Sequence, residues 1–475
     1  MFAMYPTYQY GNMDTESFMS DDQQARKIIK GTCNKTNFEF QTKALISPIQ
    51  ENKEIEDYLT VKHPLNYVET LIHLCKANIG SGIFALGNAF KNSGILLGPI
   101  LLPLLGFVCV HCQHLLINAS NSMRKTLKLH KNPDFAVTAE MCFETGPIKI
   151  RSLSPYIRKS INILLCLTQL GFCCVYFIFI STNIKQIMDY YNVVYSVHLH
   201  MAFALVPILL SCVVRNLKFL TPFSILANVL IITGILITLY YCCQKPFAEV
   251  KTVGDIKNLP LFFGTALYTF EGIGLVLPLQ NEMKKPKQFG TTLGVLNIGM
   301  VLLTIIFCLI GTLGYAKYGN EIKGSVTLNL PENEILAQSV KAIISLSILS
   351  TFALQFYIPV QIILPVVQER FGPFSKPLFV EIIFRIFLVL ITFTLAEIIP
   401  FFELFISLIG SFGSSALALI FPPILECITK SNTSELTPWI IFKNGVILSL
   451  GIFGCATGSY ESIRSIIKSF HEEQD

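Results

Sequence analysis

The sequence predicts an all-α polytopic membrane protein, and three observations lead to this fold class. The 475-residue chain is 52% hydrophobic and only 14% charged, whereas soluble domains typically carry roughly 25% charged residues. A spanning helix needs about 20 mostly apolar residues, and eleven runs of that kind follow one another along the chain. The first and sixth of these runs are interrupted by glycines. The expected spans cover residues 67–90, 94–118, 160–183, 197–214, 219–243, 259–279, 291–316, 337–366, 378–398, 401–425 and 439–459.

The two interrupted spans define the expected topology. One carries glycines at Gly80 and Gly82, and the other at Gly272 and Gly274. Glycine is unfavourable in a helix interior, and freed backbone groups are tolerated in a bilayer only where they line a cavity or are buried in protein. Breaks in the first and sixth spans indicate two five-helix halves of inverted topology, a 5+5 inverted repeat followed by one extra helix. In this arrangement the broken helices 1 and 6 meet near the midplane.

The breaks have a structural interpretation and a functional one. Small residues also permit close helix packing in membranes, but two breaks at matched positions, each beside a polar residue, favour a transport site. Freed N–H groups at helix N-termini suit a carboxylate, and freed carbonyls suit an ammonium group. Together they match the zwitterionic head of a free amino acid. The predicted substrate-binding residues are Asn78, Ile79, Gly80, Ser81, Gly82, Phe270, Gly272 and Gly274.

Two ionisable residues in these spans are candidates for proton coupling. Glu271 stands at membrane depth, where ionisable groups are expensive and commonly functional, and apolar surroundings favour its protonated form. It could carry a proton, bind the substrate ammonium, or cap freed backbone groups. His73 lies five residues before Asn78, about 7.5 Å along the helix, and histidine titrates near physiological pH. The alternative for His73 is a packed side chain with one hydrogen-bond partner.

Loop charges predict the orientation and the domain limits. Lys and Arg cluster in the loops after spans 2, 4 and 6, which places the N-terminus in the cytoplasm. The net charge of +5 is spread over loops, so we expect the lipid bilayer rather than nucleic acid as the partner of this surface. Residues 1–63 are expected to form a disordered cytoplasmic tail, residues 64–465 the transmembrane domain, and residues 466–475 a short C-terminal tail.

Other motifs carry less weight. The run from Cys109 to His114 resembles a metal cluster, but its cysteine and histidine pairs point to largely different faces of one helix, so no metal or other cofactor is expected. Ser345, Ser347, Ser350 and Thr351 in span 8 could coordinate Na⁺, although hydroxyls also bond back to helix carbonyls. Motifs of zinc peptidases, nucleophile elbows and P-loops are lacking from the sequence, which argues against an enzyme.

The sequence also resembles the proton-coupled amino acid transporter family, within the amino acid/auxin permease group, over almost all of residues 64–465. The matching stretches are Thr70–Gly82, Thr168–Phe177, Tyr268–Leu279 with Asn281–Met283, Thr327–Pro331, Gln355–Pro359 and Leu419–Pro423. Family members commonly have a proline where this chain has Leu86-Gly87-Asn88, and an acid where it has Gln280.

The resemblance implies an eleven-span inverted-repeat transporter that moves small neutral amino acids together with protons. It also implies a lysosomal, vacuolar or plasma membrane location, and it makes His73 the family's proton-responsive histidine. The leading hypothesis is therefore proton-coupled secondary active transport. A Na⁺-coupled transporter and a receptor-like amino acid sensor that does not transport remain as alternatives.

Overall fold

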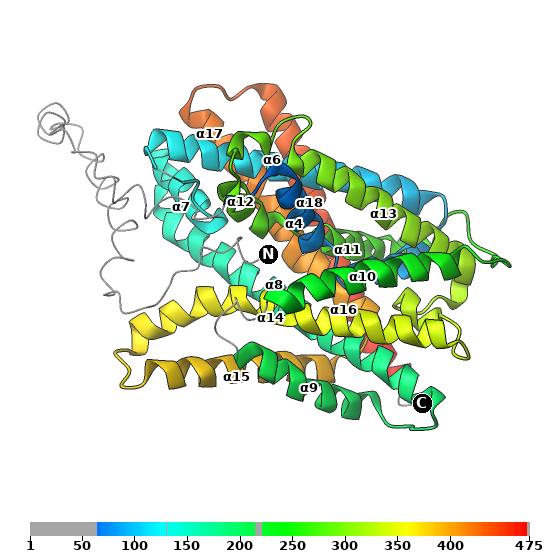
Figure 1. Cartoon of the computed structure of the whole chain (residues 1–475). Coiled ribbons are helices and arrows are strands. Elements are labelled where there is room, and N and C mark those ends of the chain that lie inside the picture. The colour runs from blue at the N-terminus through cyan, green and yellow to red at the C-terminus, as the bar shows by residue number, and fades with distance from the viewer. Residues whose placement is uncertain (1–63, 130, 214–220, 473–475) are drawn as a thin grey trace, which may run out of the picture.

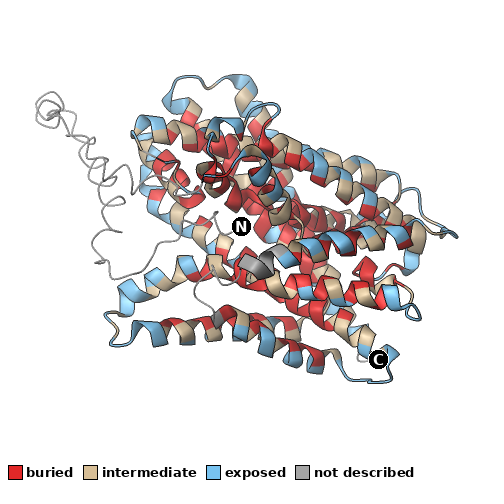
Figure 2. Ribbon diagram, in the orientation of Figure 1, coloured by how far each residue is buried: buried red, intermediate tan, exposed pale blue. Residues whose placement is uncertain are grey.

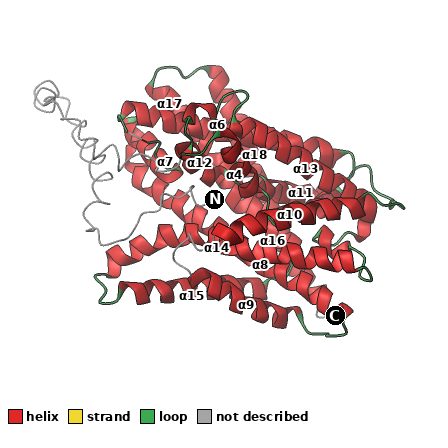
Figure 3. Cartoon of the chain, in the orientation of Figure 1, coloured by secondary structure: helices red, strands yellow, loops and turns green. Residues whose placement is uncertain are grey.

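The computed structural model describes residues 64–129, 131–213 and 221–472, and this part of the chain is a bundle of helices (Figure 1). Figure 3 shows helices and loops without a strand in the described ranges. The main helices are α4 (Tyr67–Asn78), α5 (Gly82–Ser93), α6 (Leu97–Thr126), α7 (Phe135–Thr145), α8 (Ser154–Tyr190), α9 (Val197–Val213), α10 (Thr221–Cys242), α11 (Leu259–Thr269), α12 (Ile273–Glu282), α13 (Val295–Tyr318), α14 (Ile335–Phe371), α15 (Pro377–Ile398), α16 (Phe402–Ile409), α17 (Phe421–Asn432) and α18 (Pro438–Glu472). Short 3₁₀ helices cover Ile148–Leu153, Ile256–Asn258, Pro286–Gln288, Gly319–Glu321 and Val326–Asn329.

In the described part of the chain, each of the eleven expected spans falls on one or two helices, except the tenth, which covers four consecutive helical segments. Eight helical segments of the described chain are long and apolar enough to cross a membrane, and two shorter apolar helices cover Val197–Cys212 and Leu226–Cys242. The first broken span, α4 with α5, is divided into two helices of 12 residues each. The protein is therefore a multi-pass, all-α membrane protein, while the count of eleven stays a prediction. The expected tail of residues 1–63 lies outside the described residues, and α18 continues to Glu472, through most of the expected C-terminal tail.

The distribution of burial is that of a membrane bundle. Figure 2 shows buried residues along the helix sides that face one another and exposed residues on the outside. Large apolar side chains occupy that outside, among them Phe107, Leu210 and Phe453, which are 73%, 68% and 68% exposed. Apolar surface of this extent is stable only against lipid or another apolar partner, so the outer surface fits a bilayer.

Backbone hydrogen bonds join the two broken spans at both of their ends. On one side, called here the near side, α4 begins and α12 ends. There the Leu65 N–H donates to the Glu282 carbonyl at 2.8 Å, and the Lys284 N–H donates to the Leu65 carbonyl at 2.9 Å. On the opposite, far side, the Ile95 N–H donates to the Lys251 carbonyl at 3.0 Å, and the Gly254 N–H donates to the Ser93 carbonyl at 2.8 Å. The two broken spans therefore form one connected unit.

Helix α7, in the loop between spans 2 and 3, was not predicted. It begins after Asp134, whose Oδ1 accepts from the Val137 N–H at 2.8 Å, an ordinary N-cap. The preceding Asn132 donates from Nδ2 to Gln280 Oε1 at 3.0 Å, and Asn281 donates back to the Asn132 carbonyl at 2.8 Å. This loop thus covers the near-side end of α12.

The tenth span is irregular at the segment Gly410-Ser411-Phe412-Gly413. Between α16 and α17 the chain forms two π-helical segments, η7 (Gly410–Ser414) and η8 (Ala416–Ile420). A Cβ on Gly410 would lie 1.8 Å from the Gly264 carbonyl oxygen of α11. The backbones of these two spans therefore touch, and this contact fixes the tenth span against the sixth.

Gly94 closes the far-side link, and alanine there should destabilise the fold. Its φ of +88° and ψ of 161° lie in a region open essentially to glycine alone, and a Cβ would lie 2.6 Å from Gly254 N and 2.7 Å from Thr252 O. We expect Gly94→Ala to cost at least about 1–3 kcal/mol, measured as a lower melting temperature of the purified protein. Gly445→Ala, a position with open space around it, is the matched control. Equal melting temperatures for the two variants would contradict this role of Gly94.

Candidate functional site

The first break separates α4 from α5 by three residues. Helix α4 ends at Asn78, and Ile79 adopts extended backbone angles of −87° and 103°. Helix α5 then starts at Gly82, after Ser81, which caps it without a side-chain hydrogen bond. The last carbonyls of α4 and the first N–H groups of α5 therefore lack regular helical partners, as the glycine pattern predicted.

The second break separates α11 from α12 in a similar way. Helix α11 ends at Thr269 and α12 begins at Ile273. Gly272 has φ −162° and ψ 2°, and its carbonyl accepts from the Leu275 N–H at 3.0 Å. The intervening Glu271 N–H reaches the Tyr268 carbonyl at 3.3 Å, so the chain turns out of the helix without a longer loop.

The two breaks meet at Asn78 and Gly272. A Cβ on Gly272 would lie 2.8 Å from Asn78 Oδ1 and 3.1 Å from its Nδ2. Asn78 Nδ2 donates to the Leu74 carbonyl at 2.9 Å, while its buried Oδ1 has no hydrogen-bond partner among the described residues. An acceptor oxygen thus remains available at the junction of the two broken helices.

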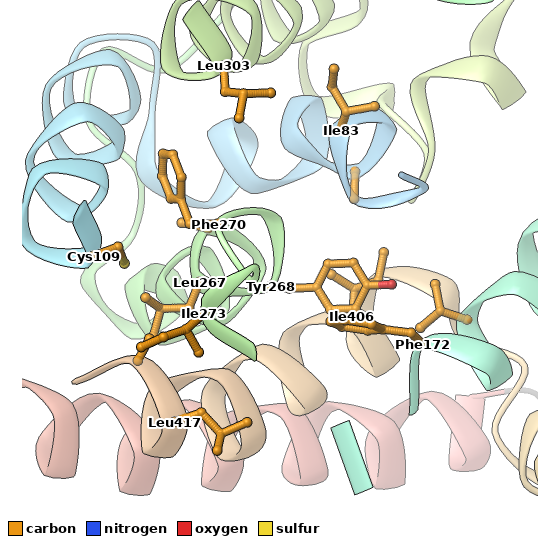
Figure 4. Close-up of a cluster of buried hydrophobic side chains, with 14 of the residues drawn as sticks. Ile83, Cys109, Phe172, Leu267, Tyr268, Phe270, Ile273, Leu303, Ile406 and Leu417 are labelled. Atoms are coloured by element: carbon orange, nitrogen blue, oxygen red, sulfur yellow. The ribbon is translucent and has the colours of Figure 1, made fainter. Parts of the chain in front are cut away.

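Two tyrosines line the first break. Ser81 Oγ lies 3.3 Å from the Tyr268 hydroxyl, and a Cβ on Gly82 would lie 2.7 Å from the Tyr268 ring. The Tyr176 hydroxyl of α8 would be 3.3 Å from a Cβ on Gly80. Figure 4 shows the Tyr268 ring against Phe172, with ring centroids 4.6 Å apart. Because the hydroxyls of Ser81, Tyr176 and Tyr268 and the ring of Tyr268 lie at the first break, a ligand bound there would contact both polar and apolar groups.

Glu271 lies in the second break and is only 8% exposed. Its Oε2 is buried and has no hydrogen-bond partner in the described part of the chain, and Ser414 of η7 lies beside the carboxyl group. A carboxylate without full hydrogen bonding is costly to bury. Protonation or a cationic ligand would remove that cost, so the surroundings of Glu271 are compatible with two of its three predicted roles, carrying a proton and binding an ammonium group.

Two predicted site residues pack against other neighbours, and a third lies before the first break. The Phe270 ring packs on Phe307 of α13, with centroids 5.5 Å apart, and Figure 4 places it on the side of Cys109 and Leu303, away from Tyr268. A Cβ on Gly274 would face Leu165 of α8 at 3.2 Å. His73 is half-buried on α4, one and a half turns before the break.

Sequence reasoning did not assign a role to Tyr176, Tyr268 or Ser414. Both tyrosines fall within stretches that carried the family resemblance, but a tyrosine in an apolar span gives no sign of where its hydroxyl points. Ser414 follows the Gly410–Gly413 segment directly. The π-helical geometry that turns it toward Glu271 has no sequence signature of its own.

The two alternative ion sites differ in the structure. His114 Nε2 lies 2.7 Å from Asn297 Oδ1, and the described residues contain no cluster of histidine, cysteine and carboxylate groups that could hold a metal. Ser350 and Thr351 donate to carbonyls of their own helix, and Ser347 donates to the Ala227 carbonyl of α10. Donation leaves the lone pairs of these three oxygens free for a cation, and Ser345 Oγ is buried with no hydrogen-bond partner in the described part of the chain, so the Na⁺ alternative stays a prediction.

Comparison with known proteins decides the family. A family model described as "Transmembrane amino acid transporter protein" matches residues 63–464. The chain belongs to this family. It is 36% identical over 417 residues to the "Proton-coupled amino acid transporter-like protein pathetic" of Drosophila melanogaster, covering 87% of this chain and 88% of that protein. It is 26% identical over 420 residues to the "Probable amino acid transporter skat-1" of Caenorhabditis elegans, covering 85% and 90%.

Family membership confirms the resemblance found in the sequence, and the family is one of transporters rather than enzymes. Among solved structures, the chain is similar to the inward-facing conformation of Mhp1, with a TM-score of 0.52, 14% identity, and coverage of 87% of this chain and 93% of that one. At this identity the likeness concerns the fold alone, and it agrees with the helical bundle and broken helices described above.

The contact between Asn78 and Gly272 can be tested by substitution. Gly272→Ala should force the Asn78 amide to move and so weaken amino acid binding at least about tenfold. Gly274→Ala meets only the end of a flexible leucine side chain and should change affinity much less. Radioligand binding to purified protein measures both. In the Asn78→Ser background Gly272→Ala should cost less, because contacting residues couple by about 0.5–3 kcal/mol, and strictly additive losses would contradict the contact.

Proposed function

We propose that this protein is a secondary active transporter that moves small neutral L-amino acids across a membrane together with protons. The observation that carries the proposal is the meeting of the two helix breaks, with the unpartnered Asn78 Oδ1 and the buried Glu271 at the junction. The printed name of the Drosophila relative, a proton-coupled amino acid transporter-like protein, supports the proposed coupling.

The substrate is held between the freed ends of the four half-helices. Its carboxylate lies at the N-terminus of α5, near Gly80, Ser81 and Gly82, where N–H groups and a partial positive charge converge. Its ammonium group lies toward the last carbonyls of α4 and α11 and the Asn78 oxygen. Tyr176 and Tyr268 lie against Gly80 and Gly82 and so border this position, which supports small neutral substrates.

The proton binds Glu271, His73 or both. Glu271 is nearer to the substrate site, since it belongs to the second break itself, and its buried carboxyl favours the neutral form. Loading of proton and substrate on the acidic side lets the connected unit of α4–α5 and α11–α12 rock against the rest of the bundle. The near side faces the cytoplasm, as the basic loops suggest, in a lysosomal, vacuolar or plasma membrane.

Uptake into proteoliposomes tests this function and its main alternative. A panel of radiolabelled common amino acids is offered with an imposed inward proton gradient, once with Na⁺ and once with an inert cation. We expect accumulation of small neutral amino acids that collapses with a protonophore and is unchanged without Na⁺. Flux that requires Na⁺ would favour the sodium alternative, and binding without flux would favour a sensor.

Replacing the buried acid should separate transport from its coupling. Glu271→Gln keeps the size of the side chain but cannot release a proton, so acid-stimulated uptake should fall at least about tenfold. Exchange of internal for external amino acid, which needs no net proton movement, should persist. Glu282→Gln changes a second buried acid of the same span, 5% exposed and at its near-side end, and should keep the pH dependence. Acid-stimulated uptake at the wild-type rate in Glu271→Gln would remove Glu271 from the mechanism.

A further inference from the structure

A small polar cavity lies on the far side of the bundle, outside the junction of the two breaks. Its volume is about 170 Å³, and its walls come from the outer parts of α5 and α11 and from the start of α16. It is smaller than the roughly 300–1,000 Å³ of pockets for drug-sized ligands. The polar side chains that line it are Asn88, Lys91, Asn92, Thr265 and Glu403.

Lys91 and Glu403 give this cavity one charge of each sign. Both are only partly exposed, and neither forms an ion pair within 4.0 Å with any residue in the described ranges, although the Glu403 carboxylate accepts a hydrogen bond from its own backbone N–H and is attracted by the charge of Lys91. Lys91 stands in the last turn of α5 and Glu403 in the first turn of α16, which are favourable places for these charges by helix dipole alone. Helix dipoles do not explain why the Lys91 ammonium and the Glu403 carboxylate line the same cavity without forming a direct ion pair.

Glu403 is held in place by close packing. A Cβ on Gly324 would lie 2.0 Å from Glu403 Oε2, so the carboxylate rests directly on the backbone of the loop before α14. A long acidic side chain confined in this way loses little further conformational freedom when it binds a cation. The position is therefore preorganised to receive an ammonium group.

The cavity is also aligned with the central site. Asn88 follows Gly82 by six residues on α5, about 9 Å along the helix. On α11, Thr265 lies one turn outside Thr269, whose hydroxyl donates to the Thr265 carbonyl at 2.8 Å. Thr269 Oγ1 in turn would lie 3.5 Å from a Cβ on Gly82. The same two helices thus form a wall of the cavity and a wall of the first break.

We infer that this cavity is a second, outer binding site for a zwitterionic amino acid, with Glu403 holding the ammonium group and Lys91 the carboxylate. Asn88 and Asn92 supply further hydrogen bonds, and Leu261 and Leu404 form an apolar wall for a short side chain. The inference rests on the proposed function, because the outer site would hold the amino acid before it reaches the junction of the breaks.

Binding stoichiometry of radiolabelled L-alanine to the purified full-length protein tests the inference. We expect two molecules per wild-type chain at saturation and one for either Glu403→Gln or Lys91→Gln. Gly80→Val, which crowds the central break, should also leave one. Glu249→Gln and Lys251→Gln change exposed charges of the same far side away from the cavity and should leave two.

Exchanging the charges of Lys91 and Glu403 distinguishes loss of the outer site from misfolding. Lys91→Glu and Glu403→Lys should each lower the stoichiometry to one, and the double variant should restore two, because the zwitterion then binds in the opposite direction. Alanine amide and N-acetylalanine, each lacking one charge, should compete poorly for the outer site.

The outcomes separate this inference from the proposed function. One site in a wild-type protein that transports alanine, or two sites in Glu403→Gln, overturns the outer site and leaves the proposed function intact. No alanine binding or uptake at all overturns both.

Discussion

An interrupted helix in a bilayer leaves backbone N–H and C=O groups that water cannot reach, and the rest of this structure depends on how they are accommodated. Each unsatisfied group would cost several kcal/mol in hydrocarbon. The chain places its two interruptions together, so that the Asn78 amide lies against Gly272 and the tyrosines of α8 and α11 cover the first break. Enclosure by the remaining helices keeps lipid away from both.

The same constraint explains the positions of several glycines far from the breaks. Because Gly264 and Gly410 have no side chains, the backbone of α11 contacts the start of η7. Gly454 of α18 leaves space for the ring of Phe263 on α11. These contacts fix the sixth span between the tenth and the eleventh. Ser414 can therefore stand beside Glu271, although the two residues are far apart in the sequence.

The helices and the two breaks could be predicted because they rest on local patterns. Apolar runs of about 20 residues mark spans, and the glycines at positions 80, 82 and 272 mark the interruptions that the structure contains. Contacts between spans could not be predicted in this way. Phe270 was grouped with the site, but its ring packs on Phe307 of α13. Helix α7 was missed because its apolar residues are too few to suggest a span, and only its contacts with α12 make it part of the bundle.

The links between the broken spans have a mechanical consequence. On the near side two backbone hydrogen bonds join Leu65 to Glu282 and Lys284 to Leu65. A hydrogen bond contributes about 0.5–1.5 kcal/mol net, so this link holds the ends of α4 and α12 together by about 1–3 kcal/mol. On the far side the hydrogen bonds from Ile95 to Lys251 and from Gly254 to Ser93 hold the ends of α5 and α11 by a similar amount. Because the two spans are tied at both ends, a displacement applied to one end of either span is passed to the other span and to the junction of the breaks, and is not absorbed by a hinge between them.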